Sequence, residues 1–125
     1  MHKRKTTNDS FRTVRGSWVM SLAAYLQEEH NLSLRKALTL AHATRSLLDE
    51  LHLGIVEFVY RENDGTTRKA RGTLKKGISP DFDNYEIKGK GNHRDNNNTE
   101  GVYKYWDLDC KGFRSFKSQN LLCYE

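Results

Sequence analysis

The sequence predicts an α+β protein in which a helical hairpin precedes a small antiparallel β module. Up to about residue 52, apolar residues recur at spacings of three and four, as on one face of a helix. Beyond Gly54 the period falls to two, and turn residues separate short runs rich in β-branched and aromatic side chains, as in antiparallel strands. A chain of 125 residues has room for one domain of ordinary size.

The first helix follows a polar start. Residues 1–9 are polar and basic, and we expect a flexible tail there. An apolar stripe of helical period then runs through residues 10–29. Its main members are Val14, Trp18, Leu22 and Tyr25. Asn31 is a suitable stop for this helix.

A second helix is predicted over residues 34–51, with Ser33 as its N-cap and Gly54 as the break after it. The residues expected on its apolar face are Ala37, Leu40, Ala41, Thr44, Leu47, Leu48 and Leu51, and Leu34 and Leu38 are expected to extend this face. The short connection favours an antiparallel hairpin over residues 10–52. We expect this hairpin to pack against the strands, and the alternative is that the first helix swings away to serve a dimer.

The remaining residues, 54–125, are predicted to form strands. Their expected ranges are 55–61, 66–74, 102–108, 113–116 and 121–124. Asn63-Asp64-Gly65 predicts a tight hairpin turn. A turn at residues 109–112 would place Asp107 opposite Arg114 and Tyr105 opposite Phe116.

Residues 75–100 interrupt the strand pattern and are expected to form a long loop. They contain the single proline of the chain and an Asn-rich run at residues 92–98. A loop of this length is either functional or partly disordered. Residues 81–87 could supply a short strand or turn within it.

Three pieces of the second half resemble a known family. They are Ala70-Arg71-Gly72-Thr73-Leu74, Tyr105-Trp106-Asp107-Leu108, and Phe113-Arg114-Ser115-Phe116-Lys117 with Asn120-Leu121-Leu122. Together they are similar to the small bacterial WYL-like family with an Sm-like SH3 β-barrel. This resemblance implies a five-stranded, strongly bent barrel and no established reaction. The predicted fold class is therefore an N-terminal helical hairpin followed by a small Sm-like, SH3-like antiparallel β-barrel.

Charge points to one candidate binding segment. The net charge of +5 favours acidic partners, with nucleic acid first. Residues 65–80 contain no Asp or Glu, so their cations could contact phosphates. These candidate binding residues are Arg68, Lys69, Arg71, Lys75 and Lys76. The alternative is a solvated strand whose charges block edge-to-edge pairing.

A second candidate set combines rings and cations, as in small barrels that stack bases on exposed aromatic side chains. Its members are Tyr103, Tyr105, Arg114 and Lys117. Because a barrel also needs rings in its interior, we expect Trp106 in the core and Tyr103 and Tyr105 on the platform. The expected Asp107–Arg114 pair is a cross-strand ion pair, or a donor site for an anionic ligand if it is partly buried.

The sequence gives no reason to expect catalysis, a metal or a cofactor. Its histidines lack metal-ligand spacing, and it has no P-loop, dinucleotide fingerprint or nucleophile elbow. Cys110 and Cys123 lack a C-x-x-C spacing, and we expect them to be reduced. No apolar run is long enough to span a membrane. We expect a non-catalytic, cytoplasmic, regulatory binding module that favours nucleic acid. The alternative is a protein-interaction or small-ligand module that acts as a homodimer or accessory subunit.

Overall fold

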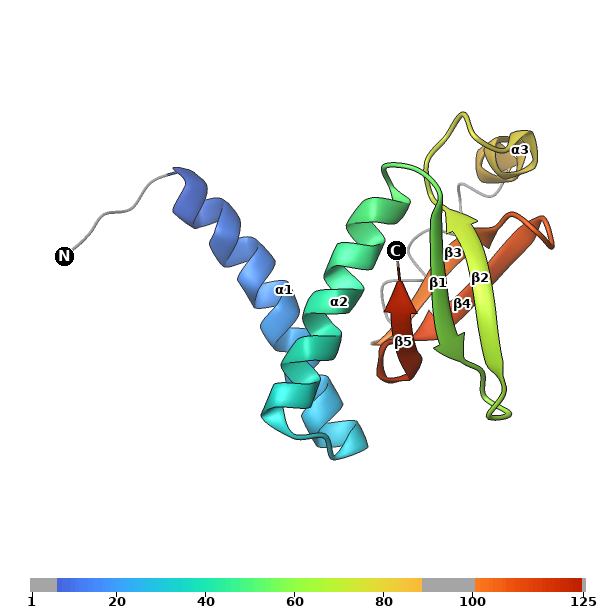
Figure 1. The fold of residues 1–125 in the computed structure, drawn as a ribbon. Coiled ribbons are helices and arrows are strands. Elements are labelled where there is room, and N and C mark those ends of the chain that lie inside the picture. The colour runs from blue at the N-terminus through green and yellow to red at the C-terminus, as the bar shows by residue number, and fades with distance from the viewer. Residues whose placement is uncertain (1–6, 89–100, 125) are drawn as a thin grey trace.

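The structure is a computed structural model that describes the backbone of residues 7–88 and 101–124. Two helices lie on one side of a five-stranded sheet, and a third helix lies at one end of it (Figure 1). The first six residues of the predicted tail, the Asn-rich run and the side chain of Val14 lie outside the described part. No helix in the described ranges is long and apolar enough to cross a membrane.

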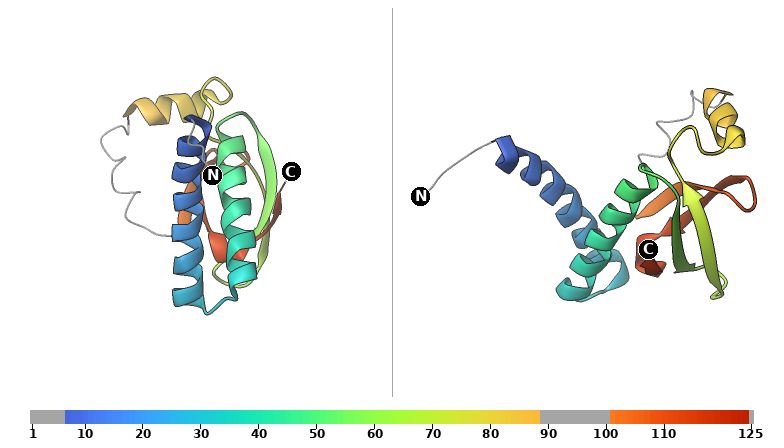
Figure 2. Two further views of the ribbon diagram at one scale, coloured as in Figure 1. Left: turned by 90° about the vertical axis from the view of Figure 1, so that its left-hand side faces the viewer. Right: turned by 45° about the horizontal axis from the view of Figure 1, so that its top comes forward.

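The predicted helical hairpin is confirmed. Helix α1 spans Thr7–His30 and helix α2 spans Leu34–Leu51, and the two run antiparallel, side by side (Figure 2). Asn31 ends α1 with a φ of 57°, the left-handed conformation that Asn tolerates. The Ser33 hydroxyl accepts a hydrogen bond from the Lys36 N–H at 3.2 Å, so it caps α2 as predicted.

Five strands follow the hairpin. They are β1 (Val56–Arg61), β2 (Thr67–Thr73), β3 (Val102–Asp107), β4 (Gly112–Lys117) and β5 (Leu121–Tyr124). The short 3₁₀ helix η2 (Ser118–Asn120) joins the last two strands. All pairs are antiparallel, in the order β4-β3-β2-β1-β5. The described sheet is bent but open, with β4 and β5 as its edges.

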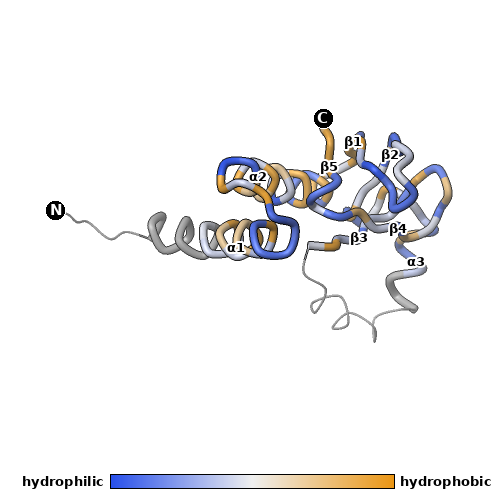
Figure 3. Tube along the Cα trace, turned by 90° about the horizontal axis from the view of Figure 1, so that it is seen from below, coloured by the Kyte–Doolittle hydropathy of each residue, from blue (hydrophilic) through white to orange (hydrophobic). Residues whose placement is uncertain are grey.

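One hydrophobic core joins the helices to the inner face of the sheet. All seven residues predicted at the centre of the apolar face of α2 are buried. In the connection between α1 and α2, the hydrophilic residues Asn31 and Ser33 are exposed, whereas Leu32 packs against the core. Figure 3 colours the backbone by hydropathy. Polar contacts fix the junction, because the Thr44 and Ser118 hydroxyls lie 2.6 Å apart and the Leu74 N–H donates to the Leu51 carbonyl at 2.8 Å.

The segment after β2 contains a helix, and the prediction of a short strand or turn over residues 81–87 was wrong. Helix α3 spans Pro80–Lys88. Ser79 caps its first turn, since its carbonyl accepts from the Asp83 N–H at 3.0 Å and its hydroxyl accepts from the Phe82 N–H at 3.4 Å. Ser, Pro and acidic residues in this order are a helix-start signal. The glycines around this segment masked that signal.

The β3–β4 register also differs from the prediction. Asp107 lies opposite Gly112 and Tyr105 opposite Arg114, so the loop begins at Leu108. The physical reason is the Asp107 carboxylate, whose Oδ1 accepts from the backbone N–H groups of Asp109 and Cys110 at 2.9 and 3.0 Å. An Asp side chain that bonds the chain two residues on nucleates a turn.

Candidate functional site

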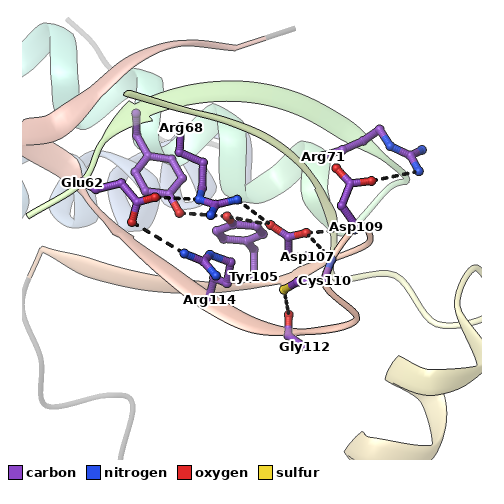
Figure 4. A network of polar contacts seen from close by, with 10 residues as sticks. Glu62, Arg68, Arg71, Tyr105, Asp107, Asp109, Cys110, Gly112 and Arg114 are labelled. Carbon is purple, nitrogen blue, oxygen red and sulfur yellow. Dashed lines mark hydrogen bonds and ion pairs between the residues drawn. The ribbon is translucent and has the colours of Figure 1, made fainter. Parts of the chain in front are cut away.

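Charged and phenolic side chains converge on the inner face of the sheet, beyond the apolar core (Figure 4). Because side chains alternate along a strand, residues paired in register with inner-face residues point to the same side. The group comprises Tyr60, Glu62, Arg68, Tyr105, Asp107 and Arg114. We call it the inner network.

Glu62 holds both arginines of the inner network. Arg68 Nε donates to Glu62 Oε2 at 2.7 Å, and a terminal nitrogen of Arg114 lies 3.6 Å from Glu62 Oε1. The short bond raises the pKa of the Arg68 guanidinium above its ordinary value. A second carboxylate, Asp107, lies 3.8 Å from Arg68. Two cations therefore face two anions, and the network is electrically balanced.

The two tyrosines connect the cationic side of the network to its anionic side. A hydrogen bond to Tyr60 is the main cause that raises the pKa of Arg114. The Tyr60 and Tyr105 hydroxyls lie 2.9 Å apart, and Tyr105 donates to Asp107 Oδ2 at 3.3 Å. Arginine can only donate. Arg114 therefore donates to Tyr60, Tyr60 donates to Tyr105, and Tyr105 donates to Asp107. Hydrogen bonds aligned in this way polarise one another.

Tyr105 is the buried residue at the centre of this series of hydrogen bonds. Its ring has no exposed surface and packs across Gly72, where a Cβ would lie 2.5 Å from its Cδ2 atom. Burial is the main cause that raises the Tyr105 pKa well above its ordinary value, and the bond to Tyr60 adds to it. The hydroxyl therefore stays protonated and serves as a fixed donor to Asp107.

The outer face of β2 carries a different set of cations. Lys69 and Arg71 point outward and are exposed, and Lys75 is exposed just after the strand. Arg71 lies 3.6 Å from the exposed carboxylate of Asp109 and opposite Glu57 in the β1–β2 register. We call Lys69, Arg71 and Lys75, together with the exposed Lys76, the outer cations.

Residues 44–122 match the family model described as WYL_2, Sm-like SH3 beta-barrel fold. The chain belongs to the WYL_2 family. Comparisons with curated proteins and with solved structures gave no match. The WYL_2 match begins at Thr44, whose hydroxyl contacts Ser118. It therefore includes the second half of α2 together with the sheet, and α1 precedes it.

The nine residues of the two candidate sets are divided among separate places on the WYL_2 fold. Arg68 and Arg114 belong to the inner network, whereas Lys69, Arg71, Lys75 and Lys76 lie outside. Tyr103 is half-buried on the inner side, with its ring 5.9 Å from those of Trp18 and Phe116. Lys117 is half-buried opposite Val102, at the other end of the β3–β4 pair from Asp107.

Two predictions for individual residues were wrong and one was confirmed. Tyr105 was expected on an exposed platform but is buried. Asp107 and Arg114 were expected to pair directly, but two tyrosines separate them in the inner network. Trp106 is buried, 2% exposed, as predicted. It lies on the outer face, where α3 covers it. Both faces of β3 are buried at this end, which strand alternation without α3 could not indicate.

Sequence reasoning missed Glu62, the residue that joins the two arginines. The signal was available in the Asn63-Asp64-Gly65 turn, which fixes the hairpin register. Gly65 takes a φ of 91° there, and Glu62 pairs with Thr66. Arg68, two residues beyond Thr66, is then the diagonal same-face neighbour of Glu62.

An aromatic cluster lies between α3 and the outer face of β3 and β4. Its members are Phe82, Tyr85, Trp106 and Phe113. The Trp106 indole nitrogen is buried and has no hydrogen-bond partner in the described part of the chain. Cys110 and Cys123 are both free and exposed. Within residues 7–88 and 101–124, no His, Cys, Asp and Glu side chains gather as a metal site.

Proposed function

We propose that this chain is a non-catalytic binding module that contacts the phosphates of a nucleic acid through its outer cations. The observation that carries the proposal is the exposure of Lys69, Arg71 and Lys75 on a stretch, residues 65–80, that contains no acid. A regulatory role in the cytoplasm is part of the proposal. Its support is the pair of exposed free cysteines, which suits a reducing compartment.

Phosphate contacts of this kind have a definite signature. Each neutralised phosphate releases counterions, so affinity falls steeply as salt rises. Such contacts position a protein on the backbone and carry no sequence preference. Asp109 and Glu57 lie beside Arg71 and oppose its attraction for phosphate. Lys69, opposite Val59, and Lys75 are therefore the better contacts to test.

The test is a salt titration of oligonucleotide binding with Lys69→Glu combined with Lys75→Glu. We expect binding at low salt that weakens steeply with added salt, and at least about a tenfold loss in the double variant. The control is Arg35→Glu with Lys36→Glu, which makes the same charge change on exposed positions in the first turn of α2. Acids are favourable in a first turn, so the control should fold. Equal losses in both variants, or no binding at low salt, would contradict the proposal.

A second candidate ligand is a small anion bound at Arg114. Its Nε atom is buried without a hydrogen-bond partner among the described residues, and its terminal nitrogen lies 3.6 Å from Glu62, longer than a charge-assisted hydrogen bond. A carboxylate or phosphate could complete these donors. Thermal shifts with inorganic phosphate and with succinate, on the natural chain and on Arg114→Gln, test this candidate. Stabilisation that the variant abolishes would support it, and no stabilisation would exclude it for these anions.

A further inference from the structure

We infer that Tyr85 on α3, together with Lys104 on β3, forms a stacking site for a nucleobase, which makes binding selective for single strands. The inference rests on the proposed nucleic-acid function and adds a contact outside the outer cations. A base in a duplex is already paired and stacked on its neighbours, so an exposed protein ring stacks much more readily on a base of a single strand.

Tyr85 is a rigid ring with free surface. Its side chain is 53% exposed, which is high for an aromatic residue within a ring cluster. Its ring centroid lies 5.1 Å from that of Phe113, edge-on at 74°, and 5.7 Å from that of Trp106 at 54°. Edge-to-face contacts of this kind fix a ring, so little conformational freedom remains to be lost when a base stacks on it.

The helix that carries Tyr85 is anchored on the sheet by Phe82. Phe82, one turn earlier in α3, is 1% exposed and lies 5.4 Å from the Trp106 ring. Phe82 thus anchors the helix while Tyr85, three residues on, reaches the edge of the same cluster. A side chain whose only role is to cover Trp106 could be aliphatic. The position would then need no ring and no free surface.

A cation lies over another ring of the same cluster. Lys104 is exposed, and its Nζ lies 5.4 Å from the Phe113 ring centroid, on the ring that also contacts Tyr85. The outer cations lead toward α3, because β2 ends at the end of the sheet where α3 lies and Lys75 and Lys76 follow β2 a few residues before α3 begins (Figure 1). A strand whose phosphates contact the outer cations would pass the end of the sheet where Tyr85 lies. Cations beside an exposed ring are what single-strand binding requires.

The experiment compares affinity for a single-stranded oligothymidylate and for a duplex of the same length. Tyr85→Leu keeps the apolar cover and removes the ring, and Tyr85→Phe keeps the ring. We expect Tyr85→Leu to weaken single-strand binding about 5- to 150-fold and to leave duplex binding within about twofold. Tyr85→Phe should bind like the natural chain. In a Trp18→Phe background Trp106 is the remaining tryptophan, and the single strand should alter its fluorescence.

The outcomes separate this inference from the function on which it rests. If Tyr85→Leu weakens both nucleic acids equally, or neither, the stacking site is wrong. The proposed function survives in that case provided that Lys69→Glu with Lys75→Glu still weakens binding at least about tenfold. If the natural chain binds neither nucleic acid at low salt, the proposed function and the stacking site both fail. Thermal unfolding checks that each variant folds. If Tyr85→Leu unfolds, the fluorescence of Trp106 in the Trp18→Phe chain decides, because the single strand should change it and the duplex should not.

Discussion

Arg68 and Lys69 are neighbours on β2, yet they belong to different parts of the molecule. Arg68 points to the inner face, where it binds Glu62 at 2.7 Å and lies 3.8 Å from Asp107. Lys69 points outward, opposite Val59, and is exposed. A strand reverses the direction of its side chains at each residue, so a basic run in the sequence becomes two surfaces with different partners.

The comparison shows which cations are available for a ligand. Those of the inner network are already balanced by carboxylates and tyrosine hydroxyls, so binding an anion there must compete with existing bonds. Lys69, Arg71 and Lys75 are exposed, and Arg71 lies 3.6 Å from the exposed carboxylate of Asp109. Exposed ion pairs contribute about 0–1 kcal/mol. Changes on the inner face should therefore cost stability, whereas changes on the outer face should alter binding at nearly constant stability.

Asp107→Ala should produce the largest loss of stability. Asp107 is 1% exposed, and its carboxylate accepts three hydrogen bonds and faces Arg68. The substitution leaves buried donors without an acceptor, so we expect a loss of about 3 kcal/mol in the free energy of unfolding. Urea denaturation measures it. The control is Asp109→Ala on the exposed partner of Arg71, which should change stability by less than about 0.5 kcal/mol. Equal effects would mean that the inner network is not a structural unit.

The sequence was sufficient for the helical hairpin and for the existence of the five strands, because these depend on local periods. The seven residues predicted at the centre of the apolar face of α2 are buried, since a face of period 3.6 must meet the core wherever the helix packs. Leu34, predicted to extend this face, is 52% exposed. The register of the β1–β2 hairpin follows from the Asp64-Gly65 turn. These features need no knowledge of distant residues.

The candidate site could be predicted only in part, because its geometry depends on contacts between distant segments. The residue types were right, since Arg68, Tyr105 and Arg114 do converge. Their partners were not found. Helix α3, which was not predicted, buries the outer face of β3 at Trp106. The prediction that only one face of β3 is buried was therefore wrong. The predicted loop began one residue too late, at Asp109 instead of Leu108. Arg114 was therefore predicted opposite Asp107, whereas it lies opposite Tyr105.

Tyr105→Phe should have an intermediate effect, and pH should change it. Removal of the hydroxyl eliminates the hydrogen bonds that Tyr105 makes to Tyr60 and to Asp107. We expect a loss of about 1 to 2 kcal/mol in the free energy of unfolding at neutral pH. The folded-state pKa of Tyr105 is raised above the unfolded value near 10. The folded chain therefore keeps a proton that the unfolded chain releases. The stabilisation by Tyr105 is complete below about pH 10 and declines above it, by up to about 1.4 kcal/mol per pH unit.

Urea denaturation of the natural chain and of Tyr105→Phe, at neutral pH and at several values above pH 10, measures this difference. The gap in unfolding free energy between the two chains should narrow as pH rises, because only the natural chain loses this contribution. A gap that stays constant through the alkaline range would mean that the Tyr105 hydroxyl does not hold its proton in the folded state.

Lys69→Ala should have the smallest effect on stability. Together with Arg68→Ala it compares the outer and the inner face of β2 at neighbouring positions. Lys69 is exposed, so its removal should change the free energy of unfolding by less than about 0.5 kcal/mol. Arg68→Ala leaves Glu62 and Asp107 facing each other without the cation between them, and we expect a loss of about 1 to 2 kcal/mol. Oligonucleotide affinity at low salt should respond in the opposite order, with the larger loss for Lys69→Ala. If both measurements rank the two variants in the same order, the two faces of β2 do not have separate roles.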